Sequence, residues 1–202
     1  MNPSPEFNPV PVILEGEHVR LEPLEISHAD DLFEAGNDEA IWRYKLVAQP
    51  ESVSDVRTWI DEILKSMANG REIAFAIIHK ADKRAIGSTR YLDIQPAHKT
   101  IEIGWTWIGR NYQRTAVNTE CKYLLLSHAF EKLGAVRVQL RTDMRNEKSK
   151  RAIERIGAIK EGVLRKSHTT HTGYVRDSVY YSIIGDEWPA VKQRLEGFLG
   201  CN

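Results

Sequence analysis

The chain has 202 residues, of which 42% are hydrophobic, and 28 Lys and Arg side chains balance 28 Asp and Glu side chains. This composition supports a sizeable core, and the zero formal charge argues against nonspecific binding to nucleic acids or membranes. No apolar run approaches the roughly 18 residues of a membrane span, and residues 1–15 lack the pattern of a leader peptide. Cys121 and Cys201 are too few for a disulfide framework, which favours the reducing cytoplasm.

The first part of the chain predicts a loose start and one domain. Three prolines within the first nine residues indicate that residues 1–11 are a loose lead-in. Residues 12–199 are expected to form a single domain. Its first element is a short strand at residues 18–22, which follows a turn at Gly16.

Two helices come next. One is expected at residues 29–35 with Ser27 as its N-cap, and the other at residues 54–67, where apolar residues recur at helical spacing. The loop between them contains Trp42 and Tyr44. Each of these aromatic residues either contacts a substrate or simply covers the core.

Three strands are expected at residues 72–78, 85–94 and 100–108, which makes an antiparallel meander. In the third strand the residues alternate, with Ile101, Ile103, Trp105 and Trp107 on one face and Glu102, Gly104 and Thr106 on the other. Gly104 indicates a bulge or a close approach of another group.

The second half of the chain predicts two helix and strand units and a closing helix. A helix with its apolar stripe beginning at Val117 leads into a strand at residues 136–142. A further helix runs from Asn146, as N-cap, to a stop at Gly157. Two long strands around a turn near Gly173 precede the closing helix at residues 187–198.

The turn between the third strand of the meander and the helix that follows it is a candidate anion site. A helix N-terminus offers unpaired N–H groups and partial positive charge, and Arg110 and Arg114 add full charges beside it. This arrangement suits a phosphate or diphosphate. The alternative is that the two arginines are solvated surface residues before an ordinary helix.

Residues 113–120, Gln-Arg-Thr-Ala-Val-Asn-Thr-Glu, resemble the acetyl-CoA motif of the GNAT N-acetyltransferase superfamily, Q/R-x-x-G-x-G/A. They resemble most the RimJ/RimL-type branch, in which the loop ends in Thr-Glu. Ala116 and Asn118 depart from the motif. Residues 146–158 resemble the second GNAT signature, N-x-x-S and its helix, and the likeness extends over roughly residues 12–195. It implies an α+β fold with a mixed, mostly antiparallel sheet of about seven strands flanked by helices.

The same resemblance implies acetyl-CoA as cosubstrate and a set of residues that bind it. By position in the two motifs and the preceding strand, these are Trp107, Ile108, Arg114, Thr115, Ala116, Val117, Asn118, Thr119, Asn146 and Ser149. The pantetheine arm would pair with the strand near Trp107 and Ile108 as an added strand.

Acetyl transfer to an amine needs a base, and Glu102 is the main candidate, acting directly or through a water. The alternatives are that Glu102 is an ordinary exposed strand carboxylate, or that Asp177 is the base. Asp177 lies among apolar neighbours and is expected mainly to pair with Arg165 across the last turn.

The general acid is less clear from the family pattern. Many GNAT enzymes use a Tyr at the position of Ile153, so Ser149 is the substitute candidate. Ser149 can instead only cap its helix or bind the cosubstrate. No metal is expected, because His168 and His171 have no further ligands at metal spacing.

These observations predict an N-acetyltransferase that transfers an acetyl group from acetyl-CoA to a primary amine by direct attack in a ternary complex. The acceptor is either a protein or peptide N-terminus or a small amine. The alternative is a non-catalytic sensor that binds CoA or another phosphorylated ligand in the same cleft. The family resemblance also implies a possible homodimer, whereas neither nucleic acid nor membrane is expected as a partner.

Overall fold

A computed structural model describes residues 7–200 of the chain. Its core is one eight-stranded sheet in the order β1-β2-β3-β4-β5-β6-β8-β7. The strands are β1 (Leu14–Glu15), β2 (Val19–Pro23), β3 (Ile73–His79), β4 (Arg84–Gln95), β5 (Thr100–Ile108), β6 (Arg137–Asp143), β7 (Ile159–Thr169) and β8 (Val175–Ile184). The helices are α1 (Ala29–Ala35), α2 (Glu39–Trp42), α3 (Val53–Ala68), α4 (Val117–Ser127), α5 (Glu147–Arg155) and α6 (Trp188–Leu199).

All neighbouring strands pair antiparallel except β5 and β6, which are parallel. This confirms the expected α+β fold with a mixed, mostly antiparallel sheet. The sheet has eight strands, one more than expected, because residues 14–15 pair with β2 ahead of the Gly16 turn. None of the helices in the described part of the chain combines the length and the apolar character that a membrane crossing needs.

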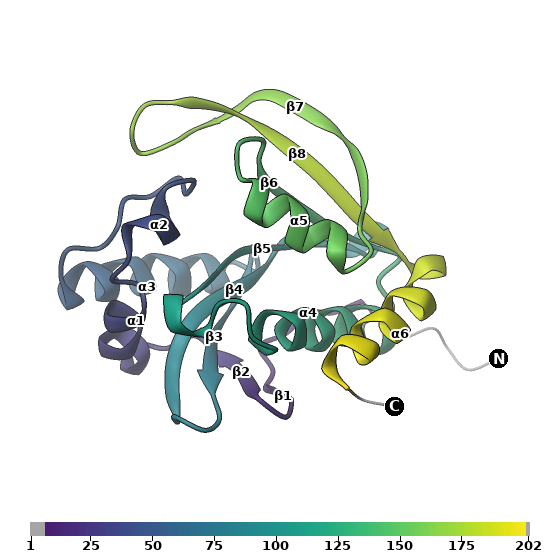
Figure 1. Cartoon of the computed structure of the whole chain (residues 1–202), viewed down its shortest axis with the longest axis horizontal. Coiled ribbons are helices and arrows are strands. Elements are labelled where there is room, and N and C mark those ends of the chain that lie inside the picture. Colours follow the sequence, from purple (N-terminus) through teal and green to yellow (C-terminus); the bar gives the residue numbers. More distant parts are fainter. Residues whose placement is uncertain (1–6, 201–202) are drawn as a thin grey trace.

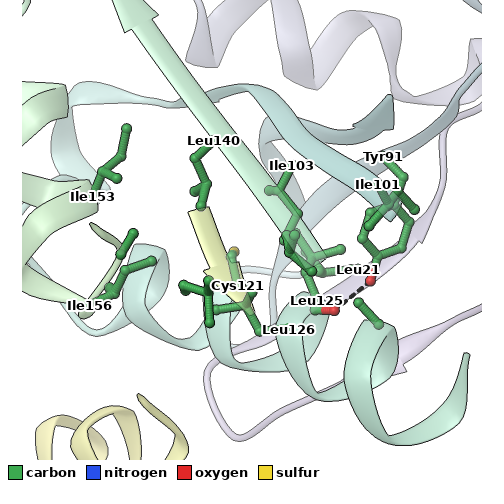
Figure 2. Close-up of a cluster of buried hydrophobic side chains, with 14 of the residues drawn as sticks. Leu21, Tyr91, Ile101, Ile103, Cys121, Leu125, Leu126, Leu140, Ile153 and Ile156 are labelled. Atoms are coloured by element: carbon green, nitrogen blue, oxygen red, sulfur yellow. Dashed lines mark hydrogen bonds between the residues drawn. The ribbon is translucent and has the colours of Figure 1, made fainter. Parts of the chain in front are cut away.

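The helices α1 and α3 lie on one side of the sheet and α4 and α6 on the other (Figure 1). Each side has its own apolar core. The strand β3 is buried on both faces: Ile73, Phe75 and Ile77 belong to the core under α4 and α6, whereas its even-numbered residues from Ala74 to Ile78 pack under α1 and α3. Figure 2 shows Leu125 of α4 in the first core, where its carbonyl accepts a hydrogen bond from the Tyr91 hydroxyl. The sheet is thus held from both sides.

The start of the chain is only partly described. Residues 7–11 form neither helix nor strand, and Phe7 is buried in the core under α4 and α6. Residues 1–6, the other part of the expected lead-in, lie outside the described residues, as does Cys201.

Helix positions agree with the sequence patterns, but one cap does not. The helix α1 spans Ala29–Ala35 as expected, yet its N-cap is His28, because a 3-10 turn at Ile26–His28 precedes it. Ser27 lies inside this turn, so its assignment as the cap was wrong. The helix α3 begins with a capping box between Ser52 and Asp55.

A bulge in β5 breaks the expected alternation of that strand. Ser88 pairs with Trp107 and Arg90 pairs with Gly104, which leaves one extra residue on β5, and Trp105 has a φ of +53°. Ile103 therefore faces the core under α4, whereas Trp107 belongs to the core under α1 and α3. The expectation of one shared apolar face was wrong, and the bulge adjacent to Gly104 is the reason.

The strands β5 and β6 pair only at Thr100–Glu102, opposite Arg137–Gln139. Beyond Glu102 the two strands separate, and β5 keeps its pairing with β4 alone. The edge of β5 that faces β6 is therefore unpaired over residues 104–108. Such an edge can accept an extended ligand as an added strand.

The expected ion pair between Arg165 and Asp177 is wrong. A bulge in β7 gives Lys166 a φ of +49°, and its amide donates to Asp177 Oδ1 at 2.8 Å. Within residues 7–200 no salt bridge joins Asp177 to a basic side chain. The backbone of the neighbouring strand, rather than a guanidinium, satisfies this half-buried carboxylate.

Candidate active site

A cavity of about 810 Å³ lies where β5 and β6 separate. Its walls come from the bulged part of β5, the end of β6 and the first turns of α4 and α5. The loop after α2 and Arg176 of β8 line its far end. Residues from these six elements thus meet in one space.

The turn into α4 carries free backbone donors into this cavity. The helix has no side-chain cap at Ala116, and no acceptor within residues 7–200 pairs with the amides of Asn118 and Thr119. The Val117 amide bonds Thr115 Oγ1 at 3.3 Å, and the Val117 side chain is buried in the core. The N-terminus of α4 is therefore open to an anion.

Ala116 fits its position without strain. Its φ is −63° and its ψ is −22°, so the residue that replaces the motif glycine needs no left-handed backbone. The left-handed residue of this turn is Arg114, with a φ of +64°. Strain of this kind in a non-glycine residue costs on the order of 1 kcal/mol and is common at binding sites.

The helix α5 forms the opposite wall. Asn146 is its N-cap, and the Asn146 Oδ1 accepts from the Ser149 amide at 3.0 Å, as the sequence predicted. Lys148 reaches Gln113 Oε1, and Arg155 donates to Thr119 Oγ1, so two cations of α5 bind residues of the turn into α4. These cations lie beside the free amides.

The two arginines expected beside the anion site lie at different cavities. Arg114 lines the cavity, but Arg110 lies 3.6 Å from Asp38 at a smaller cavity of about 360 Å³. The short 3-10 turn at Arg110–Tyr112 carries this side chain away from α4. The prediction that Arg110 flanks the site was wrong.

Glu102 is buried at the point where β5 and β6 part, with 2% of its surface exposed. Its Oε1 accepts from Arg141 Nε at 2.8 Å, and its Oε2 accepts from Gln139 Nε2 at 2.9 Å. A Cβ at position 104 would lie 2.9 Å from Glu102 Oε1, so Gly104 leaves the space that this carboxylate needs. Glu102 is therefore not an ordinary exposed strand carboxylate, which was the alternative to its role as a base.

Ser149 and Ile153 both line the cavity on α5. Ile153 is 7% exposed and packs into the core from the position where many GNAT enzymes have Tyr. Ser149 lies one turn earlier on the same face, which makes its hydroxyl a nearby proton donor.

The geometry joins free helix amides, flanking cations and an unpaired strand edge in one cavity. A family model described as "Acetyltransferase (GNAT) domain" matches residues 18–159. The chain belongs to the GNAT acetyltransferase family. Its members are acetyl-CoA-dependent N-acetyltransferases.

Similar proteins cover nearly the whole chain. The crystal structure of a GCN5-related N-acetyltransferase from Brucella melitensis is 33% identical, covers 98% of this chain and 90% of its own, and has a TM-score of 0.91. YdaF of Bacillus subtilis strain 168, provisionally named a ribosomal N-acetyltransferase, is 28% identical over 87% of this chain and 96% of its own. Mycobacterium smegmatis RimJ in complex with CoA-disulfide shares the fold, with 17% identity, 93% and 95% coverage, and a TM-score of 0.81. The name of YdaF supports the resemblance to the RimJ/RimL-type branch, whereas the RimJ structure shows the shared fold.

In this GNAT acetyltransferase the two aromatic candidates for acceptor contact separate. Trp42 is 3% exposed, donates from Nε1 to the Gly36 carbonyl at 2.8 Å and packs against Trp107. Its side chain therefore covers the core under α1 and α3. Tyr44 lines the cavity, as do Trp107 and Ile108 of the unpaired strand edge.

Four basic residues at the far end of the cavity were not among the sequence candidates: Lys45, Lys122, Arg141 and Arg176. The sequence could have identified Arg141, because this residue alternates with the apolar residues of its strand and so faces the same side as Gln139. The other three gave none, since loop, helix and hairpin positions meet only in the folded chain.

Lys122 and Lys45 both converge on Thr106 beside the bulge. Lys122 Nζ donates to Thr106 Oγ1 at 2.7 Å, and Lys45 Nζ donates to the Thr106 carbonyl at 2.9 Å. Burial lowers the pKa of Lys122 to about 8. Burial, followed by repulsion from Arg90, Lys122 and Arg176, lowers the pKa of Lys45 to about 7.

Lys122 makes the stability of the protein depend on pH. Between about pH 8, its folded pKa, and the ordinary value of 10.5, the unfolded chain binds more protons than the folded one. The free energy of unfolding should therefore rise with pH across this window, relative to that of a Lys122→Met variant, by roughly 2–3 kcal/mol. Urea denaturation of both proteins from pH 7.5 to 10.5 measures this difference, and parallel curves would contradict it.

The described residues provide neither a reactive thiol nor a cluster of metal ligands. Cys121 is a buried free thiol whose pKa burial raises to about 12, so it is not a thiolate near neutral pH. Across residues 7–200, no three His, Cys, Asp or Glu side chains gather closely enough to hold a metal ion.

Proposed function

We propose that this enzyme transfers the acetyl group of acetyl-CoA to a primary amine by direct attack in a ternary complex. The observation that carries the proposal is a single cavity in which the free amides of α4 and the unpaired edge of β5 lie together. A sequential displacement needs both substrates in one space. The cavity offers a cosubstrate end at α4 and α5 and an acceptor end under Tyr44 and Arg176.

At the cosubstrate end, the amides of residues 116–119 are proposed to bind the diphosphate of acetyl-CoA. Arg114, Lys148 and Arg155 add positive charge there, which favours an anion further. The pantetheine arm is proposed to lie along residues 104–108, where β5 has no partner strand on the side of β6. The carbonyls of Thr106 and Ile108 accept from the side chains of Lys45 and Gln113, which the arm would have to displace to pair with them. An N–H near Ile108 would then polarise the thioester carbonyl.

Glu102 is proposed as the base, acting through a water. Both of its oxygens already accept one hydrogen bond, from Arg141 and Gln139, but each carboxylate oxygen can accept a second. The deprotonated amine attacks the carbonyl carbon, the C–N bond forms and the C–S bond breaks. Ser149 is proposed to pass its hydroxyl proton to the leaving thiolate and to regain one from the proton that the nitrogen releases as it becomes the amide, so that CoA leaves as the thiol. Asp177 does not line the cavity, which makes it a poor candidate for the base.

Two acceptor classes fit this chemistry, an α-amine of a protein and a small amine. The name of YdaF points to ribosomal proteins as acceptors for that relative. A rival function, a sensor that binds CoA without turnover, is favoured by the occupied carboxylate of Glu102 and by Ile153 at the usual Tyr position.

Calorimetric titration with acetyl-CoA, combined with thiol release in the presence of an amine panel, separates these functions. The enzyme should bind acetyl-CoA at sub-millimolar concentration and release thiol with at least one amine. Tight binding without thiol release from any amine would instead favour the sensor. Absence of acetyl-CoA binding would rule out both the acetyltransferase and the sensor.

A Glu102→Gln variant is expected to lose activity by about 100-fold at neutral pH with little change in acetyl-CoA affinity. The loss should shrink as the pH rises, because the acceptor amine then arrives deprotonated. The matched control is Glu161→Gln, which also removes the carboxylate partner of an arginine, Arg137, but lies outside the cavity lining. Equal losses in the two variants, or no pH dependence, would rule Glu102 out as the base.

A further inference from the structure

The acceptor end of the cavity contains three cations that have no carboxylate partner. Arg176 is 8% exposed, and its one side-chain hydrogen bond within residues 7–200 runs from Nη1 to the Tyr44 carbonyl at 3.1 Å. Lys45 and Lys122 donate to the carbonyl and hydroxyl oxygens of Thr106. All three side chains are therefore paired only with neutral oxygens.

The acidic groups nearest to these cations are already engaged. Glu102 is bound by Arg141 and Gln139, as described above. Asp143 accepts from Arg145 Nε at 3.0 Å and Nη2 at 2.7 Å.

The third acid near this end, Glu72, accepts from Arg90 Nη1 at 2.8 Å. Each carboxylate thus has its own arginine, and within residues 7–200 none remains to pair with Lys45, Lys122 or Arg176. Repulsion among these basic groups therefore adds to burial in lowering the pKa of Lys45. An uncompensated excess of buried positive charge is costly for a protein unless a ligand supplies the anion.

The loop after α2 and the β7–β8 hairpin also meet at this end of the cavity. Arg176 of β8 bonds the Tyr44 carbonyl, and His171 Nδ1 lies 3.4 Å from the Lys45 carbonyl. In Figure 1 the β7–β8 hairpin accordingly reaches over toward the loop that follows α2. An end that these contacts bridge fits a small acceptor better than a long peptide.

We propose that the acceptor is a small amine that carries a carboxylate close to the amine, as amino acids do, and that Arg176 and Lys45 bind this carboxylate. The proposal rests on the proposed function and names its substrate class. A planar guanidinium matches the two oxygens of a carboxylate, and charge-assisted hydrogen bonds are the strong ones. A bound anion also relieves the repulsion that Lys45 experiences from Arg90, Lys122 and Arg176. A peptide N-terminus has a neutral amide where this acceptor has its anion.

The test compares amino acids of different side chains with their own amides, and with a C-terminally amidated peptide, in the thiol-release assay. The better amino acids should have a kcat/KM about tenfold or more above that of their amides. The amine of an amide has the lower pKa, so the comparison is biased against the proposal. Amides or the peptide that react as well as the amino acids would overturn it.

Arg176→Gln should abolish the preference for the carboxylate and leave acetyl-CoA affinity unchanged. Arg57→Gln is the matched control, since Arg57 is an exposed helix residue that pairs with Asp30 at 3.2 Å, and it should keep the preference. Lys45→Gln is the second variant if Arg176→Gln does not fold, and it should reduce the preference. A preference that persists in the folded variants overturns the proposal.

Different results would overturn the acceptor class and the acetyltransferase function. Thiol release without any preference for carboxylated amines would overturn the acceptor class and leave the acetyltransferase function standing. Acetyl-CoA binding without thiol release from any amine would overturn the function, and the acceptor class with it.

Discussion

Replacing Glu120 by alanine is expected to lower the free energy of unfolding by roughly 3–5 kcal/mol. Glu120 is 5% exposed, and its carboxylate accepts three backbone hydrogen bonds at the start of β2. The amides of Glu17, His18 and Val19 donate to it at 2.7, 2.8 and 2.7 Å. The alanine variant leaves all three amides without their acceptor, and the amide of Val19 is buried away from water.

Chemical denaturation of the wild type and the variant measures this effect. Glu120→Gln should lie between them, because its amide keeps one acceptor oxygen. Glu62→Ala is the control, since Glu62 is an exposed residue of α3 and its loss should change stability by no more than about 0.5 kcal/mol. A Glu120→Ala variant within 1 kcal/mol of the wild type, on the order of a single hydrogen bond, would show that the three amides find other partners.

Ala116→Asp is expected to weaken acetyl-CoA binding by about 100-fold or more, since it places a carboxylate where the diphosphate should bind. Stability should stay the same or rise by up to about 1 kcal/mol, because an acidic residue in the first turn suits the helix dipole. Loss of affinity without loss of stability is the signature of an anion site at this helix end.

Ala116→Asn is the matched control, because it has nearly the same shape without the charge. Calorimetric titration should place its acetyl-CoA affinity within about threefold to tenfold of the wild type, the cost of one altered polar contact. Similar affinities for the aspartate and asparagine variants would contradict a diphosphate site at α4, and thermal melts of both variants complete the comparison.

The sequence predicted those parts of the fold that depend on local pattern. The helices α1 and α3 and the strands β3 and β4 appear within a few residues of their expected bounds, because amphipathic spacing and turn residues are local signals. Asn146 and Gly157 begin and end α5 as expected for the same reason.

Features that depend on pairing between distant segments could not be read in this way. The bulge at Trp105 is a property of the register between β4 and β5, and it moves Trp107 to the opposite face. Glu120 ends the recognised motif, but its partners lie about one hundred residues earlier in the chain.

The same distinction between local patterns and distant pairing applies to the candidate site. The turn at residues 113–119 and the Asn146 helix were identified from contiguous motifs, and both line the cavity. The acceptor end was missed, because Lys45, Lys122 and Arg176 come from a loop, a helix and a hairpin. Trp42 is the opposite case. The sequence made it a candidate for acceptor contact, but in the structure its side chain lies in the core under α1 and α3.

A crystal structure of the enzyme with CoA bound tests most directly whether the N-terminus of α4 binds the diphosphate. We expect diphosphate oxygens within hydrogen-bond distance of the amides of residues 116–119, and the pantetheine arm alongside residues 104–108. A CoA molecule bound elsewhere, with the N-terminus of α4 untouched, would contradict it.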